Sequence, residues 1–398
     1  MGFLLVCAVL MVCYEFFFCD HFIGYMDGKL YYQYLPEFFI EHNFSFYVKF
    51  PMGTALCELV FFLAGHLLTL MFAPRAASGY GGFYEYAVGF AGIFYFTVGM
   101  VLLFLTLKQL FSEKTAAKTG ILLVLGTPLV LYGTKYASFS HIYTFAAGSL
   151  LLYLTVRIET QTTEKRKTHI RAFLIGAAAG LLFLIRNVNA VFLLIYLLYD
   201  FGDDKNFKAH IKSIFSKDRL PYHLSGGLVL VLPQLLYWKK VTGSFLLNTY
   251  AEESFSYLLR PKFYEVLFSD AKGYFIFTPL MILGILGFFF VKNLSVPGRA
   301  TCGILMAAEV GVLIWNLFQK RTKQENSWIQ IEAWLILVFF GQPYQILSTF
   351  MMRTGMRIQD VWWLPIVTAV ALYAFGTALT SCVFGGILRR TPRRQMTE

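Results

Sequence analysis

Long apolar runs recur along almost the whole of this 398-residue chain, and they constrain its fold more than any other feature. They fall at residues 1–19, 52–72, 84–107, 119–134, 142–156, 172–185, 189–200, 223–238, 274–291, 300–317, 333–350 and 361–388. Charged residues make up only 14% of the chain, against about 25% in an ordinary soluble domain. The sequence therefore predicts an all-α, polytopic integral membrane protein with about 9–11 transmembrane helices.

Positive charge is concentrated in the polar segments between the apolar runs. The chain has a formal net charge of +11 at pH 7, and basic loops of this kind follow the positive-inside rule. We therefore expect membrane lipids as a partner, and no nucleic acid. The basic loops that bear on topology are 108–118, 157–171, 201–222 and 292–299. All four are cytoplasmic if the run at 52–73 does not cross the membrane.

The run at 52–73 thus decides the predicted topology. Glu58 and His66 lie within it, on nearly one helical face. Together with the basic loops, this favours an interfacial or re-entrant helix, with the first helix (1–19) running from inside to outside. The first run has no basic leading region and no small-residue cleavage site, so it is predicted to be a membrane helix and not a cleaved signal.

Residues 24–41, after the first apolar run, have the pattern of an amphipathic helix. Polar side chains recur at steps of four, at Lys29, Gln33, Glu37 and Glu41. The other face carries Leu30, Tyr31, Tyr34, Leu35, Phe38 and Phe39. Such a helix is suited to lie on a membrane surface, with a kink at Pro36. We expect Asp27 to cap its start at the outer water–lipid boundary. A capping role and nothing more is the simpler alternative for Asp27.

The predicted outer face has few ionisable side chains, and they come from separate segments. They are Asp20, Asp27, Lys49, Lys135, His141, Arg186 and the basic residues of the loop at 239–273. One or two carboxylates among several cations suit a lipid-linked phosphosugar as substrate. The cations stabilise the departing phosphate, and one carboxylate suffices to accept the proton of the incoming acceptor. Glycoside hydrolysis, in contrast, usually requires two carboxylates.

Simpler roles remain open for these residues. Lys49 and Lys135 can extend their amino groups to the membrane interface without binding a substrate. His141 can be a structural hydrogen-bonding residue. Arg186 has the least ordinary position, because an arginine at the edge of a membrane segment implies a buried partner.

Short polar and aromatic motifs recur in a fixed order over residues 1–291. They are DGKLYYQYLP at 27–36, KFPMG at 49–53, SFSH at 138–141, LIRNVN at 184–189, and the later pairs and triplets at 233–234, 242–244 and 277–279. Their order and spacing resemble the GT-C superfamily of polyprenyl-phosphate-sugar glycosyltransferases, close to the bacterial protein mannosyltransferase and aminoarabinose transferase branch. The resemblance implies a GT-C-like transmembrane catalytic module over 1–292, with juxtamembrane helices in the first outer loop. It is weak over the C-terminal transmembrane helices at 293–398.

The resemblance also implies an activity and a site. The chain would be an inverting glycosyltransferase of the cell membrane, acting on the extracytoplasmic side. It would move a sugar from a polyprenyl-phosphate donor to a lipid, glycan or protein acceptor. Asp27 matches the first catalytic acid of the family and would be the base. Lys49 is similar to a phosphate-contacting lysine of the family. The substrate-binding residues would be Lys49, Arg186, His141 and Asp20.

Two departures from the family pattern keep other functions open. Gly28 stands where the family often has a second acid, and another family acid is replaced around Ser140 and His141. The six cysteines show no C-x-x-C pair or zinc spacing, so we expect no cofactor, although a divalent metal is not excluded. The alternatives are a transporter or flippase of a lipid-linked sugar and a non-catalytic membrane relative.

Overall fold

The structure is a computed structural model that describes residues 2–18, 23, 26–110, 113–160, 165–199 and 204–247. The predictions for Asp20 and for the apolar runs after residue 247 lie outside these residues. By its internal contacts the chain divides into two compact units. The first holds residues 1–121, 128–256 and 290–323, and the second holds 122–127, 257–289 and 324–398. Apart from 122–127, all the described residues belong to the first unit.

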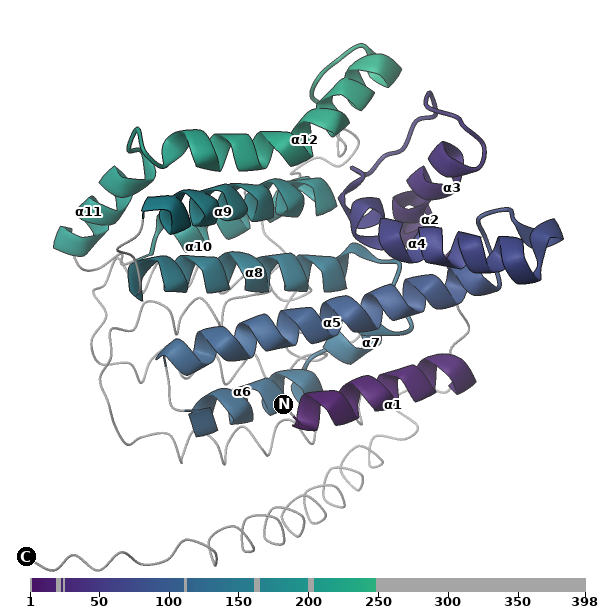
Figure 1. The fold of residues 1–398 in the computed structure, drawn as a ribbon, viewed down its shortest axis with the longest axis horizontal. Coiled ribbons are helices and arrows are strands. Elements are labelled where there is room, and N and C mark those ends of the chain that lie inside the picture. Colours follow the sequence, from purple (N-terminus) through teal and green to yellow (C-terminus); the bar gives the residue numbers. More distant parts are fainter. Residues whose placement is uncertain are drawn as a thin grey trace, which may run out of the picture. The chain divides into compact units, whose positions relative to one another are not determined.

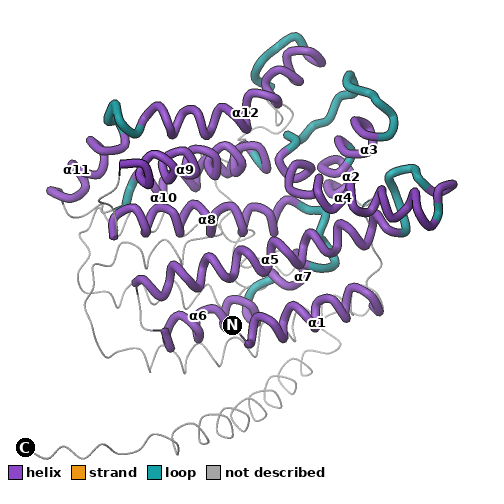
Figure 2. Tube along the Cα trace, viewed as in Figure 1, coloured by secondary structure: helices purple, strands orange, loops and turns teal. Residues whose placement is uncertain are grey.

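Every regular element in the described residues is helical (Figures 1 and 2). The helices are α1 (Gly2–Phe18), α2 (Met26–Tyr32), α3 (Tyr34–Phe39), α4 (Gly53–Phe72), α5 (Phe83–Leu110), α6 (Glu113–Gly126), α7 (Leu129–Gly133), α8 (Ser140–Thr160), α9 (Lys165–Ile185), α10 (Leu193–Leu197), α11 (Asp204–Ile214) and α12 (Leu220–Thr242). Two short 3₁₀ helices, η1 (Pro74–Ala76) and η2 (Asn187–Phe192), lie between them. The predicted all-α fold is therefore confirmed for this part of the chain.

Three of the described helices contain segments long and apolar enough to cross a membrane. These segments are Gly53–Phe72, Phe83–Gln109 and Arg166–Ile185. Shorter apolar segments lie in α1, in α8 and across η2 and α10. The membrane character of the chain is thus supported, whereas the count of about 9–11 spans and the GT-C architecture stay predictions.

Helices α5, α8, α9 and α12 lie side by side, in that order (Figure 1). Glycines allow the helix backbones to approach closely. A Cβ atom at Gly176 of α9 would collide with the carbonyl of His223 in α12, and one at Gly226 would collide with the carbonyl of Phe173. In the same way Gly99 of α5 packs against Phe145 of α8. These contacts run in parallel register, so α9 and α12 begin at the same end of the layer.

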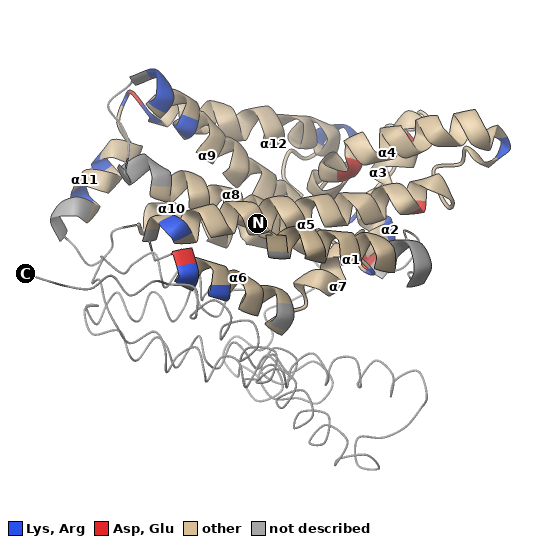
Figure 3. Ribbon diagram, turned by 60° about the horizontal axis from the view of Figure 1, so that its bottom comes forward, with Lys and Arg blue, Asp and Glu red and all other residues tan. Residues whose placement is uncertain are grey.

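That end carries most of the described basic side chains (Figure 3). It lies where α5 and α8 finish and where α9 and α12 begin, and α11 lies there too. Its exposed or half-exposed cations include Lys108, Arg166, Lys167, Lys208, Lys212, Lys217 and Arg219. The described parts of the loops 108–118, 157–171 and 201–222 thus lie at one end, as the sequence predicted, and 292–299 lies outside the described residues. The cytoplasmic assignment of this end stays a prediction.

Helix α4 packs antiparallel along the first half of α5. The backbone of Gly65 lies against Phe83 and Ala87, while the Tyr95 hydroxyl donates a hydrogen bond to the Cys57 carbonyl at 3.1 Å. The start of α8 lies beside Tyr95 of α5. Helix α4 therefore packs on the N-terminal part of α5, and α8 packs on the part that follows. This arrangement is compatible with the interfacial placement expected for 52–73. That placement stays a prediction, because α4 is also long enough to span.

The two faces of α4 differ as the sequence predicted. Its outward stripe consists of Leu56, Val60, Leu63, Leu67 and Met71, all exposed. Glu58 and His66 are turned toward the protein. Glu58 is fully buried, and His66 Nδ1 lies 2.6 Å from the Tyr84 hydroxyl.

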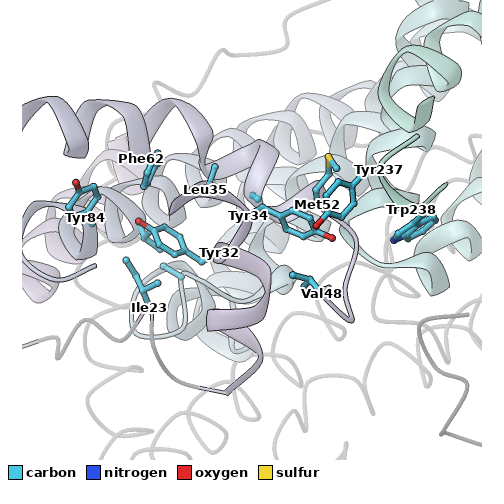
Figure 4. Packing of buried hydrophobic residues seen from close by; sticks show 13 residues of the cluster. Ile23, Tyr32, Tyr34, Leu35, Val48, Met52, Phe62, Tyr84, Tyr237 and Trp238 are labelled. Carbon is cyan, nitrogen blue, oxygen red and sulfur yellow. The ribbon is translucent and has the colours of Figure 1, made fainter. Parts of the chain in front are cut away.

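The described part of the amphipathic segment is helical as α2 and α3, and protein covers much of its apolar face. Tyr31, Tyr32, Tyr34 and Leu35 are each at most 3% exposed. Most of them belong to a protein core that also includes residues of α4, α5 and α12 (Figure 4). The expectation that the membrane covers this face was wrong for Tyr31, Tyr34 and Leu35, because an amphipathic pattern does not specify whether lipid or protein covers the apolar face. Phe39 of the same face is 43% exposed.

Two local expectations for this segment had different outcomes. The predicted kink is present, since α2 ends at Tyr32 and α3 starts at Tyr34, which places the break at Gln33, about one turn before Pro36. Proline has no N–H to bond the carbonyl four residues earlier, which is that of Tyr32. The capping prediction was wrong, because α2 begins at Met26 and Asp27 lies inside its first turn. A carboxylate in a first turn still interacts favourably with the helix dipole.

Candidate functional site

The motif at 27–36 contacts the motif at 138–141 through Gly28. Gly28 is buried in α2, and a Cβ atom there would collide with the Ser138 hydroxyl and lie 3.5 Å from the Phe139 ring. An added side chain at this position requires the side chain of Ser138 to move. A larger side chain beside Asp27, such as that of a second acid, would therefore displace Ser138. Asp27 itself is exposed.

The same two short helices bind the motif at 49–53. The ring of Tyr31 stacks on that of Phe50, with centroids 4.4 Å apart. The Tyr34 hydroxyl donates to the Phe50 carbonyl at 2.8 Å, and burial raises the pKa of Tyr34, so this hydroxyl stays a neutral donor. Lys49, adjacent to Phe50, is half-buried, with Nζ 5.8 Å from the Phe50 ring centroid.

Contacts at the start of α4 bring two further motifs to this place. The backbone at Gly53 lies directly against Leu184 and Ile185 at the end of α9. The Met52 amide donates to Oε1 of Gln234 in α12 at 2.8 Å, and Gln234 is fully buried. The motifs at 49–53, 184–189 and 233–234 are therefore in direct contact, although they are separated by up to about 180 residues in the chain.

Aromatic contacts reinforce this junction. The Tyr237 hydroxyl of α12 donates to the Phe46 carbonyl. Its ring makes an edge-to-face contact with Tyr34, with centroids 5.6 Å apart, and a similar one with Phe38. Edge-to-face pairs of this kind stabilise a defined geometry beyond the area they bury. The loop that carries Lys49 is thus fixed on both sides, by α3 and by α12 (Figure 4).

Arg186 and His141 lie at the same end of the helix layer as Asp27. Arg186 follows α9 with an extended backbone and a half-buried side chain. Three residues later Asn189 is buried and donates to the Thr144 hydroxyl at 2.9 Å. The ring of His141, the second residue of α8, packs on Tyr132 with centroids 4.2 Å apart. That contact fits the structural role left open for His141, and its substrate-binding role stays a prediction.

One pair near this site was missed in the search for functional residues. Glu58 of α4 is fully buried, and its Oε1 lies 2.9 Å from the hydroxyl of Tyr143 in α8. A carboxyl group within an apolar run is itself a signal of function, but Glu58 entered the sequence argument only through topology. No sequence signal singles out Tyr143. Within the described ranges, no three His, Cys, Asp or Glu side chains are grouped to hold a metal ion.

Comparisons with known proteins add no relative to this picture: no family model, no curated protein and no solved structure matches the chain. The function is therefore argued from the site and from the residues that carry the resemblance.

Proposed function

We propose that this protein is an integral-membrane, inverting glycosyltransferase that uses a polyprenyl-phosphate-linked sugar on the extracytoplasmic side of the membrane. Asp27 is its catalytic base, and Lys49 and Arg186 bind the donor phosphate. The acceptor is a lipid, a glycan or a protein.

The observation that carries this proposal is the convergence of the motifs. Segments 27–36, 49–53, 138–141 and 184–189 are separate in sequence, yet each contacts another through a glycine, an aromatic stack or a hydrogen bond from a side chain to a backbone carbonyl. Chance resemblance of scattered short motifs gives no reason for them to meet in space. Their meeting point is opposite the basic end of the helix layer (Figure 3), which fits an extracytoplasmic site under the positive-inside rule.

The chemistry needs few groups. The acceptor oxygen forms a bond to C1 of the sugar as the bond from C1 to the phosphate oxygen breaks, which inverts the anomeric centre. The leaving group is polyprenyl phosphate, and its negative charge is stabilised by Lys49 and Arg186. The acceptor proton passes to the carboxylate of Asp27, which is exposed and so open to a substrate. One acid is enough for this reaction, so the lack of a second acid at Gly28 does not argue against it.

The direct test uses purified protein in lipid nanodiscs with a synthetic polyprenyl-phosphate sugar and a membrane extract as the source of acceptors. We expect release of polyprenyl phosphate together with a glycosylated acceptor of inverted anomeric configuration. A second arm places the protein in vesicles with a fluorescent lipid-linked sugar. Movement of intact donor between leaflets without cleavage would instead identify a carrier. Neither cleavage nor movement, by folded protein that still binds donor, would indicate a non-catalytic relative.

A further inference from the structure

Glu58 and Tyr143 form a buried polar pair directly behind the turn that supports α2. Both side chains are fully buried. Glu58 Oε1 lies 2.9 Å from the Tyr143 hydroxyl, and Oε2 has no hydrogen-bond partner among the described residues. Burying a carboxyl group costs free energy unless hydrogen bonds compensate it. A half-satisfied carboxyl at this place therefore calls for a role other than stability.

The hydroxyl of Tyr143 has a second contact, which leads to the candidate site. It lies 2.8 Å from the carbonyl oxygen of Ala137. A tyrosine hydroxyl has one proton, so it can donate to only one of these two oxygens. Both hydrogen bonds form together when Glu58 is neutral, because Glu58 then donates to the Tyr143 oxygen and Tyr143 donates to Ala137.

Ala137 is adjacent to the residue that contacts α2. The next residue, Ser138, is the one against which Gly28 packs, and Gly28 is adjacent to Asp27. Backbone bonds in the turn run from the Tyr136 amide to Leu131, from the Ala137 amide to Thr134 and from the Phe139 amide to Tyr136. An unbroken series of contacts thus runs from Glu58 through Tyr143 and the turn to the helix that carries Asp27.

The pair is also fixed from the side. The Tyr143 ring makes an edge-to-face contact with Tyr95, with centroids 5.0 Å apart, and the Tyr95 hydroxyl binds the Cys57 carbonyl. Cys57 precedes Glu58, so α4, α5 and α8 meet at this point. Three helices therefore set the position of the Tyr143 hydroxyl.

We infer that Glu58 and Tyr143 are positioning residues for the proposed reaction. They hold the turn at 134–139 in place, and this turn fixes the position of α2 and Asp27. The inference rests on the proposed function. Its physical basis is that a general base acts only within hydrogen-bonding reach of the proton it removes, so a shift of about 1 Å in its support costs up to about a hundredfold in rate.

The central variant is Tyr143→Phe, which keeps the ring and removes the hydroxyl. We expect kcat for transfer to fall about ten- to a hundredfold, with the KM for donor nearly unchanged, because Lys49 and Arg186 bind the donor independently of the turn. Glu58→Leu should lower kcat in the same way. Glu58→Gln should retain near-normal kcat, since its amide can donate to Tyr143 as a neutral carboxyl does.

A readout independent of activity is backbone hydrogen exchange in purified protein. In Tyr143→Phe the amides of Ala137 and Phe139 should exchange at least about fivefold faster, because one hydrogen bond that holds the turn is lost. The matched control is Thr69→Val, which removes another buried hydroxyl from α4. Thr69 is 2% exposed and bonds only to the carbonyl of Gly65 in its own helix, so neither kcat nor exchange at the turn should change.

The outcomes separate the two proposals. A wild-type protein that transfers no sugar overturns the proposed function and the positioning role together. A wild-type protein that transfers, with a Tyr143→Phe variant of unchanged kcat or unchanged exchange at the turn, overturns the positioning role alone. Equal effects of Tyr143→Phe and Thr69→Val would reduce the pair to ordinary core packing and overturn the inference as well.

Discussion

The two ends of the layer formed by α5, α8, α9 and α12 are built differently. At the end that holds Asp27, segments from distant parts of the chain interlock, as in the bonds from Tyr34 to Phe50 and from Met52 to Gln234. At the other end helices also contact one another, as in the hydrogen bond between His210 and the Tyr196 carbonyl, but cations such as Lys208 and Lys212 are exposed. A basic end needs only charge to orient a protein in a membrane, whereas a reaction centre needs fixed geometry. The contrast fits the proposal that the basic end orients the protein in the membrane and that the opposite end holds the reaction site.

We expect the two ends of the helix layer to face opposite sides of the membrane. In a cysteine-depleted background, single cysteines at Ser45 and Ser78, both exposed and on either side of α4, should both react with an impermeant thiol reagent added outside. A Lys212→Cys variant should react only after the membrane is permeabilised. This all-or-none pattern follows if α4 does not cross. Labelling of Ser45→Cys but not Ser78→Cys would show that α4 spans and would remove the topological argument.

Gly28 is a sterically restricted position at the site end, where an added Cβ atom meets the side chain of Ser138. Gly28→Ala should lower transfer by at least about tenfold, since its Cβ collides with Ser138 and displaces α2 by a fraction of an ångström or more. Adding Ser138→Gly should restore much of the activity by removing the obstacle. Gly2→Ala is the control, because nothing lies within 4 Å of its added Cβ. A Gly28→Ala protein with full activity would show that the contact is not tight.

Substitutions of Lys49 and Lys212 compare the loss of a cation at the site end with the loss of a cation at the basic end. Lys49→Ala should raise the donor concentration needed for half-maximal transfer about tenfold, a factor equal to about 1.4 kcal/mol, because it removes a charge at the phosphate. Lys49→Arg should retain part of the activity, since the charge stays but its geometry differs. Lys212→Ala should leave donor use unchanged. Normal donor dependence in Lys49→Ala would reduce Lys49 to an interfacial anchor.

Tyr34→Phe tests the interlocking itself. Loss of the hydroxyl leaves the Phe50 carbonyl without its donor and should destabilise the protein by about 1–3 kcal/mol. Tyr47→Phe, at a side chain that is 59% exposed, should change stability by less than about 0.5 kcal/mol. Thermal unfolding of both variants in one detergent measures the difference. Equal stabilities would mean that the junction is held mainly by apolar packing.

Sequence patterns predicted the helices better than the contacts between them. The apolar runs at 52–72 and 84–107 correspond closely to α4 and α5, because length and composition suffice to recognise an apolar helix. The run at 172–185 covers only the later part of α9, which starts at Lys165. The run at 119–134 is divided between α6 and α7 near Pro128. The run at 189–200 forms η2 and α10, which are too short to cross.

The contacts of the site could not be read from the sequence. Periodicity showed that Tyr31 and Leu35 share a face, but not that protein covers it. The collision between Gly28 and Ser138 depends on how α2 meets the turn before α8, which is a tertiary property. Tyr143 looks like any aromatic residue in an apolar helix, and only its distance to Glu58 gives it a role.

The most direct test of the central claim is the rate of sugar transfer by Asp27→Asn. Asparagine keeps the shape of the side chain but cannot accept the acceptor proton, so we predict a fall in kcat of at least about a hundredfold. The matched control is Glu41→Gln, which neutralises an exposed carboxylate just after α3 and should leave the rate unchanged. Both variants should match the wild type in thermal stability. Near-full transfer by Asp27→Asn would contradict the assignment of Asp27 as the base.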